Sequence, residues 1–238
     1  IETSIESANK TAFSKIMSPS SGINAYNGLT GEKYQDLFSE SVFSGKGLID
    51  VNAFCSVMPD KFPNQKILSH DILEGIVLRC AFVGDVSFTD SFPRSLNSFL
   101  AREHRWMRGD IQNTIFLKIK KKRVTDSVFP FTQRFRLFDN IRRAITPIFT
   151  FSALILSCFA DGKTSVILSI FALLCTAAGE LFSSVYALIF GGVRAFSRLY
   201  ASDSAPNALM CAVRGLIYVA VLPYSFLNSA DAVIRTLY

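Results

Sequence analysis

The chain has 238 residues, of which 50% are hydrophobic and only 18% are charged. Soluble domains carry about a quarter charged residues, so the composition argues against a wholly soluble protein. The shortage of charge is confined to residues 144–238, while residues 1–143 have the mixed charge of a soluble domain. We therefore expect a soluble part followed by a membrane part.

The net charge of +6 is clustered just before the apolar part of the chain. One basic cluster occupies residues 118–123, and four arginines follow between residues 134 and 143. Basic runs bind nucleic acid in some proteins and anionic lipid headgroups in others. The position beside a membrane segment favours a cytoplasmic flank that contacts membrane lipids, so no nucleic acid partner is expected.

Cysteine and histidine usage argues against several kinds of site. The five cysteines are odd in number and include no CxxC pair, and only two histidines are present. This pattern disfavours a disulfide framework, a zinc site and a histidine-rich metal centre. The chain starts at Ile1 without an initiator methionine or a signal peptide, and it stops within a helical pattern at Tyr238. We therefore expect a segment of a longer protein.

The soluble part alternates short predicted elements. A short helix or loop extends to about residue 17, and turn-rich sequence follows it. Further helices are predicted at residues 34–38, 51–58, 72–80 and 95–107, and strands at residues 42–50 and 81–89.

The membrane part begins with an amphipathic segment. Residues 131–143 alternate phenylalanines and arginines, which predicts a helix lying in the membrane interface. Glu180 is expected to face protein or water, because a charge in a bilayer is costly. Pro223 is expected to end or kink the last apolar segment, which also carries Arg214. Spanning candidates are predicted at residues 144–160, 164–190 and 207–222, and a second interfacial stretch at 228–238.

Two blocks in the soluble part contain the candidate catalytic and ligand-binding side chains. Residues 69–75 read SHDILEG, and residues 102–110 read REHRWMRGD with the only tryptophan. Asp71 would begin a predicted helix, with Glu74 one turn later on the same face. In the second block Arg102, Arg105 and Trp106 fall at i, i+3 and i+4 and share one helix face.

Glycosyl transfer from a nucleotide sugar needs groups of these types. Asp71 is predicted to be the catalytic base that deprotonates the acceptor hydroxyl. Arg102 and Arg105 would stabilise the leaving diphosphate, and Trp106 would stack on the acceptor sugar. Each also has a plainer interpretation: an N-cap for the aspartate, a solvated helix face for the arginines and a core position for the tryptophan.

Four further residues complete the expected substrate-binding set. Gly45 and Lys46 lie in a turn with glycines on both sides of the lysine. Because glycine has no side chain, the backbone of such a turn can approach a ligand closely. A plain turn is the alternative there. Glu74 and His104 belong to the two blocks described above.

The order of these blocks resembles the processive family 2 glycosyltransferases such as cellulose synthase. Asp71 stands where the aspartate of their TED motif would be, and Arg102 replaces the glutamine of QxxRW. A closer resemblance, from about Gly28 onward, is to the glycosyltransferase part of cyclic β-1,2-glucan synthases. One departure is Ile111, where an aromatic residue is expected. The matching blocks are GLTGEK at 28–33, FSGKGLIDV at 43–51, LSHDILEG at 68–75, HRWMRGD at 104–110, RLFDNIRR at 136–143, LPY at 222–224 and DAVIRTLY at 231–238.

The resemblance implies an α/β fold plus membrane α-helices. Residues 1–125 would be the C-terminal half of a GT-A-type catalytic domain, residues 126–143 an amphipathic interfacial helix, and residues 144–238 a transmembrane region of two to three helices. The implied location is the inner membrane, as a multi-pass protein with the catalytic part in the cytoplasm.

The resemblance also implies an activity. Glucose would pass from UDP-glucose to a growing β-1,2-glucan acceptor, with inversion at the anomeric carbon. Mg²⁺ or Mn²⁺ would be held by a DxD motif, which this chain lacks, so its ligands would lie in an upstream nucleotide-binding half. Further domains would lie downstream, and this segment alone is expected to be inactive. The alternatives are a synthase of another polysaccharide, such as cellulose or hyaluronan, and a non-catalytic membrane structural or binding module.

Overall fold

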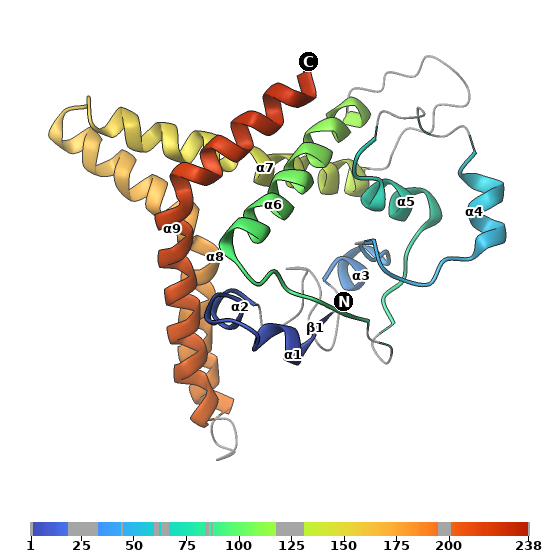
Figure 1. The fold of residues 1–238 in the computed structure, drawn as a ribbon, viewed down its shortest axis with the longest axis horizontal. Coiled ribbons are helices and arrows are strands. Elements are labelled where there is room, and N and C mark those ends of the chain that lie inside the picture. The colour runs from blue at the N-terminus through green and yellow to red at the C-terminus, as the bar shows by residue number, and fades with distance from the viewer. Residues whose placement is uncertain are drawn as a thin grey trace. The chain divides into compact units, whose positions relative to one another are not determined.

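The computed structural model describes residues 2–18, 33–43, 45–59, 62, 67–83, 86, 88–117, 131–194 and 201–237. These residues are mainly helical (Figure 1). They divide into two compact units, one formed by Ile1–Ala144 with Ala232–Tyr238 and the other by Ile145–Asp231.

The first unit contains short helices and one longer helix, α6. Its described elements are β1 (Glu2–Thr3), α1 (Ile5–Ala8), α2 (Ala12–Met17), α3 (Lys33–Phe38), α4 (Val51–Val57), α5 (Asp71–Leu78), β2 (Thr89–Asp90), α6 (Leu96–Gln112) and the 3₁₀ helix η1 (Asn113–Leu117). The four helices predicted between residues 34 and 107 are therefore confirmed, although α6 continues past Gly109.

Polar caps explain where several of these helices begin. The Asp50 carboxylate accepts hydrogen bonds from the backbone N–H groups of Asn52 and Ala53, at 2.9 and 3.0 Å, and starts α4. The Ser95 hydroxyl accepts from the N–H of Ser98 at 3.3 Å and starts α6. Such caps satisfy N–H groups that the first helical turn leaves without partners.

The predicted strands do not form as expected. Among the described residues, 42–50 contain no strand, and the segment at 81–89 reaches strand geometry only at β2. There Thr89 and Asp90 pair in parallel with Glu2 and Thr3. An apolar strand needs neighbours to pair with, and Val83, Val86 and Phe88 instead stay exposed. The described residues are mainly helical, and they do not show the α/β fold of a GT-A-type domain.

The core of the first unit lies where α5 meets helix α7 (Phe131–Ser157). Arg136 of α7 is buried there, donates to the backbone oxygens of Ser41 and Glu40 at 2.9 and 2.6 Å, and lies 4.6 Å from the Tyr34 ring centroid. One face of the predicted interfacial helix is therefore packed against protein, while Phe131 on its other face is exposed. The buried apolar cluster consists of Ile72, Leu73, Ile76, Phe116 and Leu137.

The second unit contains the most apolar helices. Helices α8 (Gly162–Arg194) and α9 (Ala201–Leu237) each include a segment long and apolar enough to cross a membrane, namely Gly162–Val185 and Ala208–Leu237. Helix α7, which carries the predicted first span, is not among them. Helix α9 also does not end at Pro223, because a proline removes only one helical hydrogen bond and long packed helices tolerate it.

A charged pair joins the two apolar helices. Glu180 of α8 and Arg214 of α9 face each other, with Arg214 Nε 3.0 Å from Glu180 Oε2. The Ser184 hydroxyl donates to the Ala208 backbone oxygen at 2.9 Å, which makes the two helices antiparallel neighbours, as Figure 1 also shows. Glu180 faces protein, so its charge is compensated inside the hairpin.

Replacing one member of this pair should weaken the hairpin. We expect Glu180→Ala to lower its stability by about 1 kcal/mol, the scale of polar contacts between membrane helices. The charge-reversed double variant Glu180→Arg with Arg214→Glu should recover most of the loss. Thermal unfolding in detergent, followed by circular dichroism, measures both effects. Equal unfolding temperatures for the wild type and Glu180→Ala would contradict the structural role of the pair.

Candidate functional site

The predicted base, Asp71, is the first residue of α5 and not its N-cap. His70 occupies the cap position without a side-chain capping bond. The Asp71 carboxylate lies against Gly45, where a Cβ atom would come within 2.6 Å of Oδ2. Gly45 has a φ of +83°, a conformation that favours glycine. Two residues predicted from separate blocks are therefore in contact, and only glycine fits between the turn and the carboxylate.

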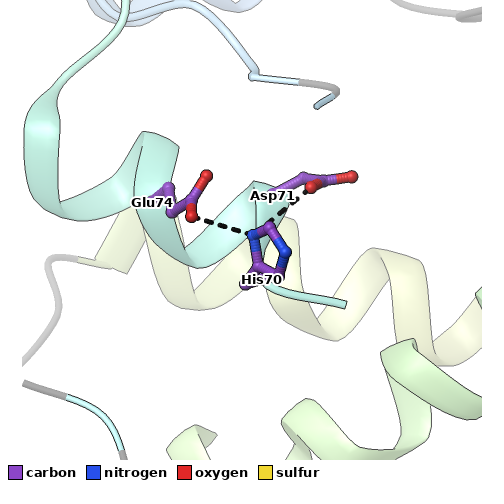
Figure 2. A group of neighbouring side chains, drawn as sticks. All are labelled: His70, Asp71 and Glu74. Atoms are coloured by element: carbon purple, nitrogen blue, oxygen red, sulfur yellow. Dashed lines mark ion pairs between the residues drawn. The ribbon is translucent and has the colours of Figure 1, made fainter. Parts of the chain in front are cut away.

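His70, Asp71 and Glu74 form a cluster at the start of α5 (Figure 2). His70 Nδ1 lies 2.8 Å from Glu74 Oε1 and 3.6 Å from Asp71 Oδ1. The Glu74 side chain is 14% exposed and the Asp71 side chain 41% exposed. Glu74 therefore anchors the imidazole from the protein side, while the Asp71 carboxylate stays accessible to a substrate.

Close contacts bring together several of the sequence blocks described above. A Cβ on Gly75 would come within 2.7 Å of Phe43 Cβ, and a Cβ on Gly109 would collide with Ser69 Cβ. The Asn113 amide also donates to the Ser69 backbone oxygen at 3.3 Å. The segment before α5 is thus held between the turn at residues 43–47 and the end of α6.

Arg105 and Trp106 lie one turn before Gly109 on α6. Residues three and four apart share a helix face, so both belong to the face that meets Ser69. Arg105 is exposed, and Trp106 keeps 43% of its surface exposed. Trp106 is therefore not a core residue, and both side chains are accessible to a ligand.

Arg102 has a different environment. Its guanidinium carbon lies 4.7 Å from the Trp106 ring centroid and 5.2 and 5.7 Å from those of Phe92 and Phe99. The alternative interpretation of a solvated helix face therefore fits Arg105 but not Arg102, which packs against aromatic rings. His104, on the same helix, is half-buried.

Lys46 forms an ion pair that the sequence did not predict. Its Nζ lies 2.6 Å from Asp90 Oδ2, and this hydrogen bond holds the pKa of the Asp90 carboxyl below its usual range. Lys46 and Glu74 also line one cavity of about 340 Å³ beside the turn at residues 43–47. Apolar side chains such as Leu48 and Val83 form much of its wall. Lys46 would have to leave Asp90 to bind a ligand anion.

Helix α6 also carries two acids, Glu103 and Asp110, that the sequence analysis did not single out. Burial raises the pKa of Glu103, and burial raises the pKa of Asp110 to about 6. The Asn140 amide donates to Asp110 Oδ1 at 3.3 Å, and the charge of Arg143 also favours the ionised carboxylate. The seven-residue spacing of the acids places them on one helix face, but only tertiary packing shows that this face is covered.

The donor atoms at the start of α5 fit a magnesium or manganese ion poorly. His70, Asp71 and Glu74 offer atoms within 4.8 Å of one another. Mg²⁺ prefers oxygen ligands throughout, and the imidazole is already paired with Glu74. The expectation that the metal ligands lie outside this chain remains a proposal.

Comparison with known proteins finds a relative among the glucan synthases. The chain is related to the cyclic β-(1,2)-glucan synthases. It is 29% identical over 233 residues to the cyclic beta-(1,2)-glucan synthase NdvB of Rhizobium meliloti (strain 1021). The match covers 96% of this chain and 8% of that protein. No protein-family model matches the chain.

The raised pKa of Asp110 makes the stability of the first unit depend on pH. The pKa of this carboxyl is about 3.9 in the unfolded chain and about 6 in the folded one. The stabilisation that Asp110 gives the folded state is therefore complete below about pH 3.9 and is lost as the pH rises through about 6. We expect the free energy of unfolding to fall by roughly 2 kcal/mol between pH 4 and pH 7. Denaturant unfolding followed by Trp106 fluorescence measures it.

Asp110→Asn should reduce this slope, leaving the part that comes from Glu103. The exposed Asp36 provides a matched control, because Asp36→Asn should leave the slope unchanged. An Asp110→Asn variant with the full wild-type slope would contradict the assignment.

The contact between Gly109 and Ser69 should tolerate no added methyl group. Gly109→Ala is expected to destabilise the first unit by about 1–3 kcal/mol through overpacking, although alanine favours helices. Removing the opposing Cβ in the double variant Ser69→Gly with Gly109→Ala should restore most of the stability. The same fluorescence unfolding assay measures the effect. A Gly109→Ala single variant as stable as the wild type would contradict the tight contact between α6 and the segment before α5.

Proposed function

We propose that this chain forms the acceptor side of a membrane-bound glycosyltransferase that builds a β-1,2-glucan. The observation that carries the proposal is the contact of Gly45 with the Asp71 carboxylate. It leaves the carboxylate exposed beside a close-packed turn and without a capping role. The relationship to NdvB supports a role in glucan synthesis, and the two apolar helices support a membrane location.

In this proposal the residues have separate tasks. Asp71 accepts the proton of the acceptor hydroxyl as that oxygen attacks the anomeric carbon of the donor sugar. Glu74 Oε1 lies 2.8 Å from His70 Nδ1 and so restricts the position of the imidazole beside the Asp71 carboxylate. Arg105 stabilises the charge on the departing diphosphate, and Trp106 supports the acceptor sugar.

The donor, stereochemistry and location follow the same proposal. The donor is UDP-glucose and the reaction inverts the anomeric centre, which a single displacement assisted by one base accomplishes. A magnesium or manganese ion bound outside this chain would supply further charge stabilisation of the diphosphate. The first unit would lie in the cytoplasm at the inner membrane, working with other segments of a longer synthase and built on a GT-A-type domain.

Replacing Asp71 tests the role of the base. We expect Asp71→Asn in the full-length protein to reduce glucan synthesis at least about 100-fold, because an amide cannot accept the proton. The control is Asp36→Asn, which removes a carboxylate from the exposed surface of α3. Incorporation of labelled glucose into polymer is the measurement. Synthesis by Asp71→Asn at the wild-type rate would leave a non-catalytic membrane-binding module as the better explanation.

Product analysis separates the proposed activity from other polysaccharide synthases. Membranes containing the full-length protein are incubated with labelled UDP-glucose or with other labelled UDP-sugars, and the linkage of the polymer is mapped. Glucose joined through β-1,2 bonds is the expected product. A β-1,4-linked glucan or a hyaluronan-type polymer would keep the enzyme class and overturn the assigned product.

A further inference from the structure

Arg102 is surrounded by three aromatic rings that differ in their exposure. Its guanidinium carbon lies within 4.7 to 5.7 Å of the centroids of Trp106, Phe92 and Phe99. Phe92 and Phe99 are 5% and 9% exposed, whereas Trp106 is 43% exposed. The arginine therefore connects two fixed buried rings to one accessible ring.

The buried rings are themselves held by the N-terminal helices. The Phe92 backbone N–H donates to the Ser7 hydroxyl of α1 at 2.6 Å. The Phe99 ring packs edge-on against Phe13 of α2, with centroids 6.0 Å apart. Phe92 and Phe99 also face each other at 6.2 Å. The wall behind Arg102 is thus anchored by contacts on two sides.

We propose that Arg102 is a positioning residue that fixes the indole of Trp106 for sugar stacking. The guanidinium plane and the indole attract each other, and the Phe92–Phe99 wall keeps the guanidinium in place. A platform that is rigid before binding loses less conformational freedom when a sugar stacks on it. The identity of the ligand as a sugar rests on the proposed function, whereas the positioning of Trp106 by Arg102 does not.

This role differs from the diphosphate contact expected from the sequence. Arg102 and Arg105 lie one turn apart on α6, yet Arg105 is exposed and Arg102 is stacked on aromatic rings. The task of binding an anion therefore suits Arg105, and the task of supporting the indole suits Arg102. The two roles predict different kinetic defects.

Fluorescence tests the positioning directly, because Trp106 is the only tryptophan of the chain. We expect Arg102→Ala to raise the acrylamide quenching constant of Trp106 about twofold, because the variant removes the guanidinium group that covers one face of the indole. Arg102→Lys keeps the charge without the planar group, so its quenching constant should lie between those of the wild type and Arg102→Ala. Arg105→Ala should leave the quenching constant unchanged.

A second fluorescence arm includes the sugar. A β-1,2-linked gluco-oligosaccharide should protect Trp106 from acrylamide in the wild type, and its half-protecting concentration should rise about tenfold in Arg102→Ala. Phe92→Leu, which keeps an apolar side chain but removes one ring of the wall, should give a smaller rise in the same direction. This variant keeps the test valid if Arg102→Ala fails to fold.

Kinetics in the full-length protein separate the two roles. Arg102→Ala should raise KM for the glucan acceptor about tenfold, with KM for UDP-glucose within twofold of the wild type. A raised KM for UDP-glucose with an unchanged acceptor KM would assign Arg102 to the diphosphate and overturn the proposal. Unchanged quenching in Arg102→Ala would overturn it as well. If Asp71→Asn still synthesises glucan while Arg102→Ala loosens Trp106, the catalytic proposal fails and the positioning stands.

Discussion

The first unit depends on the close approach of α6 to the segment that leads into α5. At Gly109 the helix backbone meets Ser69 so closely that a side chain would collide with it. The Asn113 amide and the Gln112 side chain then bind the backbone of Ser69 and Leu68. Because α5 follows directly, this contact determines where the carboxylate at its first residue lies relative to the arginine and tryptophan face of α6.

The same contact gives α6 two faces with different tasks. Toward Ser69 the helix carries Arg105 and Trp106, which remain accessible to solvent. On the other face Met107 and Ile111 pack in a cluster with Ala144 of α7 and the end of α9. Burial also raises the pKa values of the α6 acids Glu103 and Asp110, which lie beside these two faces. A single helix thus joins the proposed substrate surface to the hydrophobic support of the unit.

The environments of several charged residues are set by the groups that they contact and could not be inferred from residue type. Arg136 and Arg102 are both arginines in sequence patterns that suggest solvent or lipid contact. Arg136 is buried against backbone oxygens, and Arg102 is stacked on aromatic rings. Glu180, by contrast, follows the expectation that a charge in an apolar helix faces protein, because Arg214 compensates it.

The sequence alone determined the helices, the apolar segments, the spacing of the candidate residues and the relationship to glucan synthases. Helical periodicity, capping residues and long apolar runs are local signals, so they can be interpreted without knowing the fold. The sequence did not reveal that the segment at 81–89 would form only a two-residue strand, because strand formation depends on a partner far away in the chain. Tertiary structure alone decided that Gly45 touches Asp71, that Lys46 pairs with Asp90 and that Arg102 stacks on Trp106. Each of these contacts depends on which surfaces meet, and spacing along the chain does not encode that.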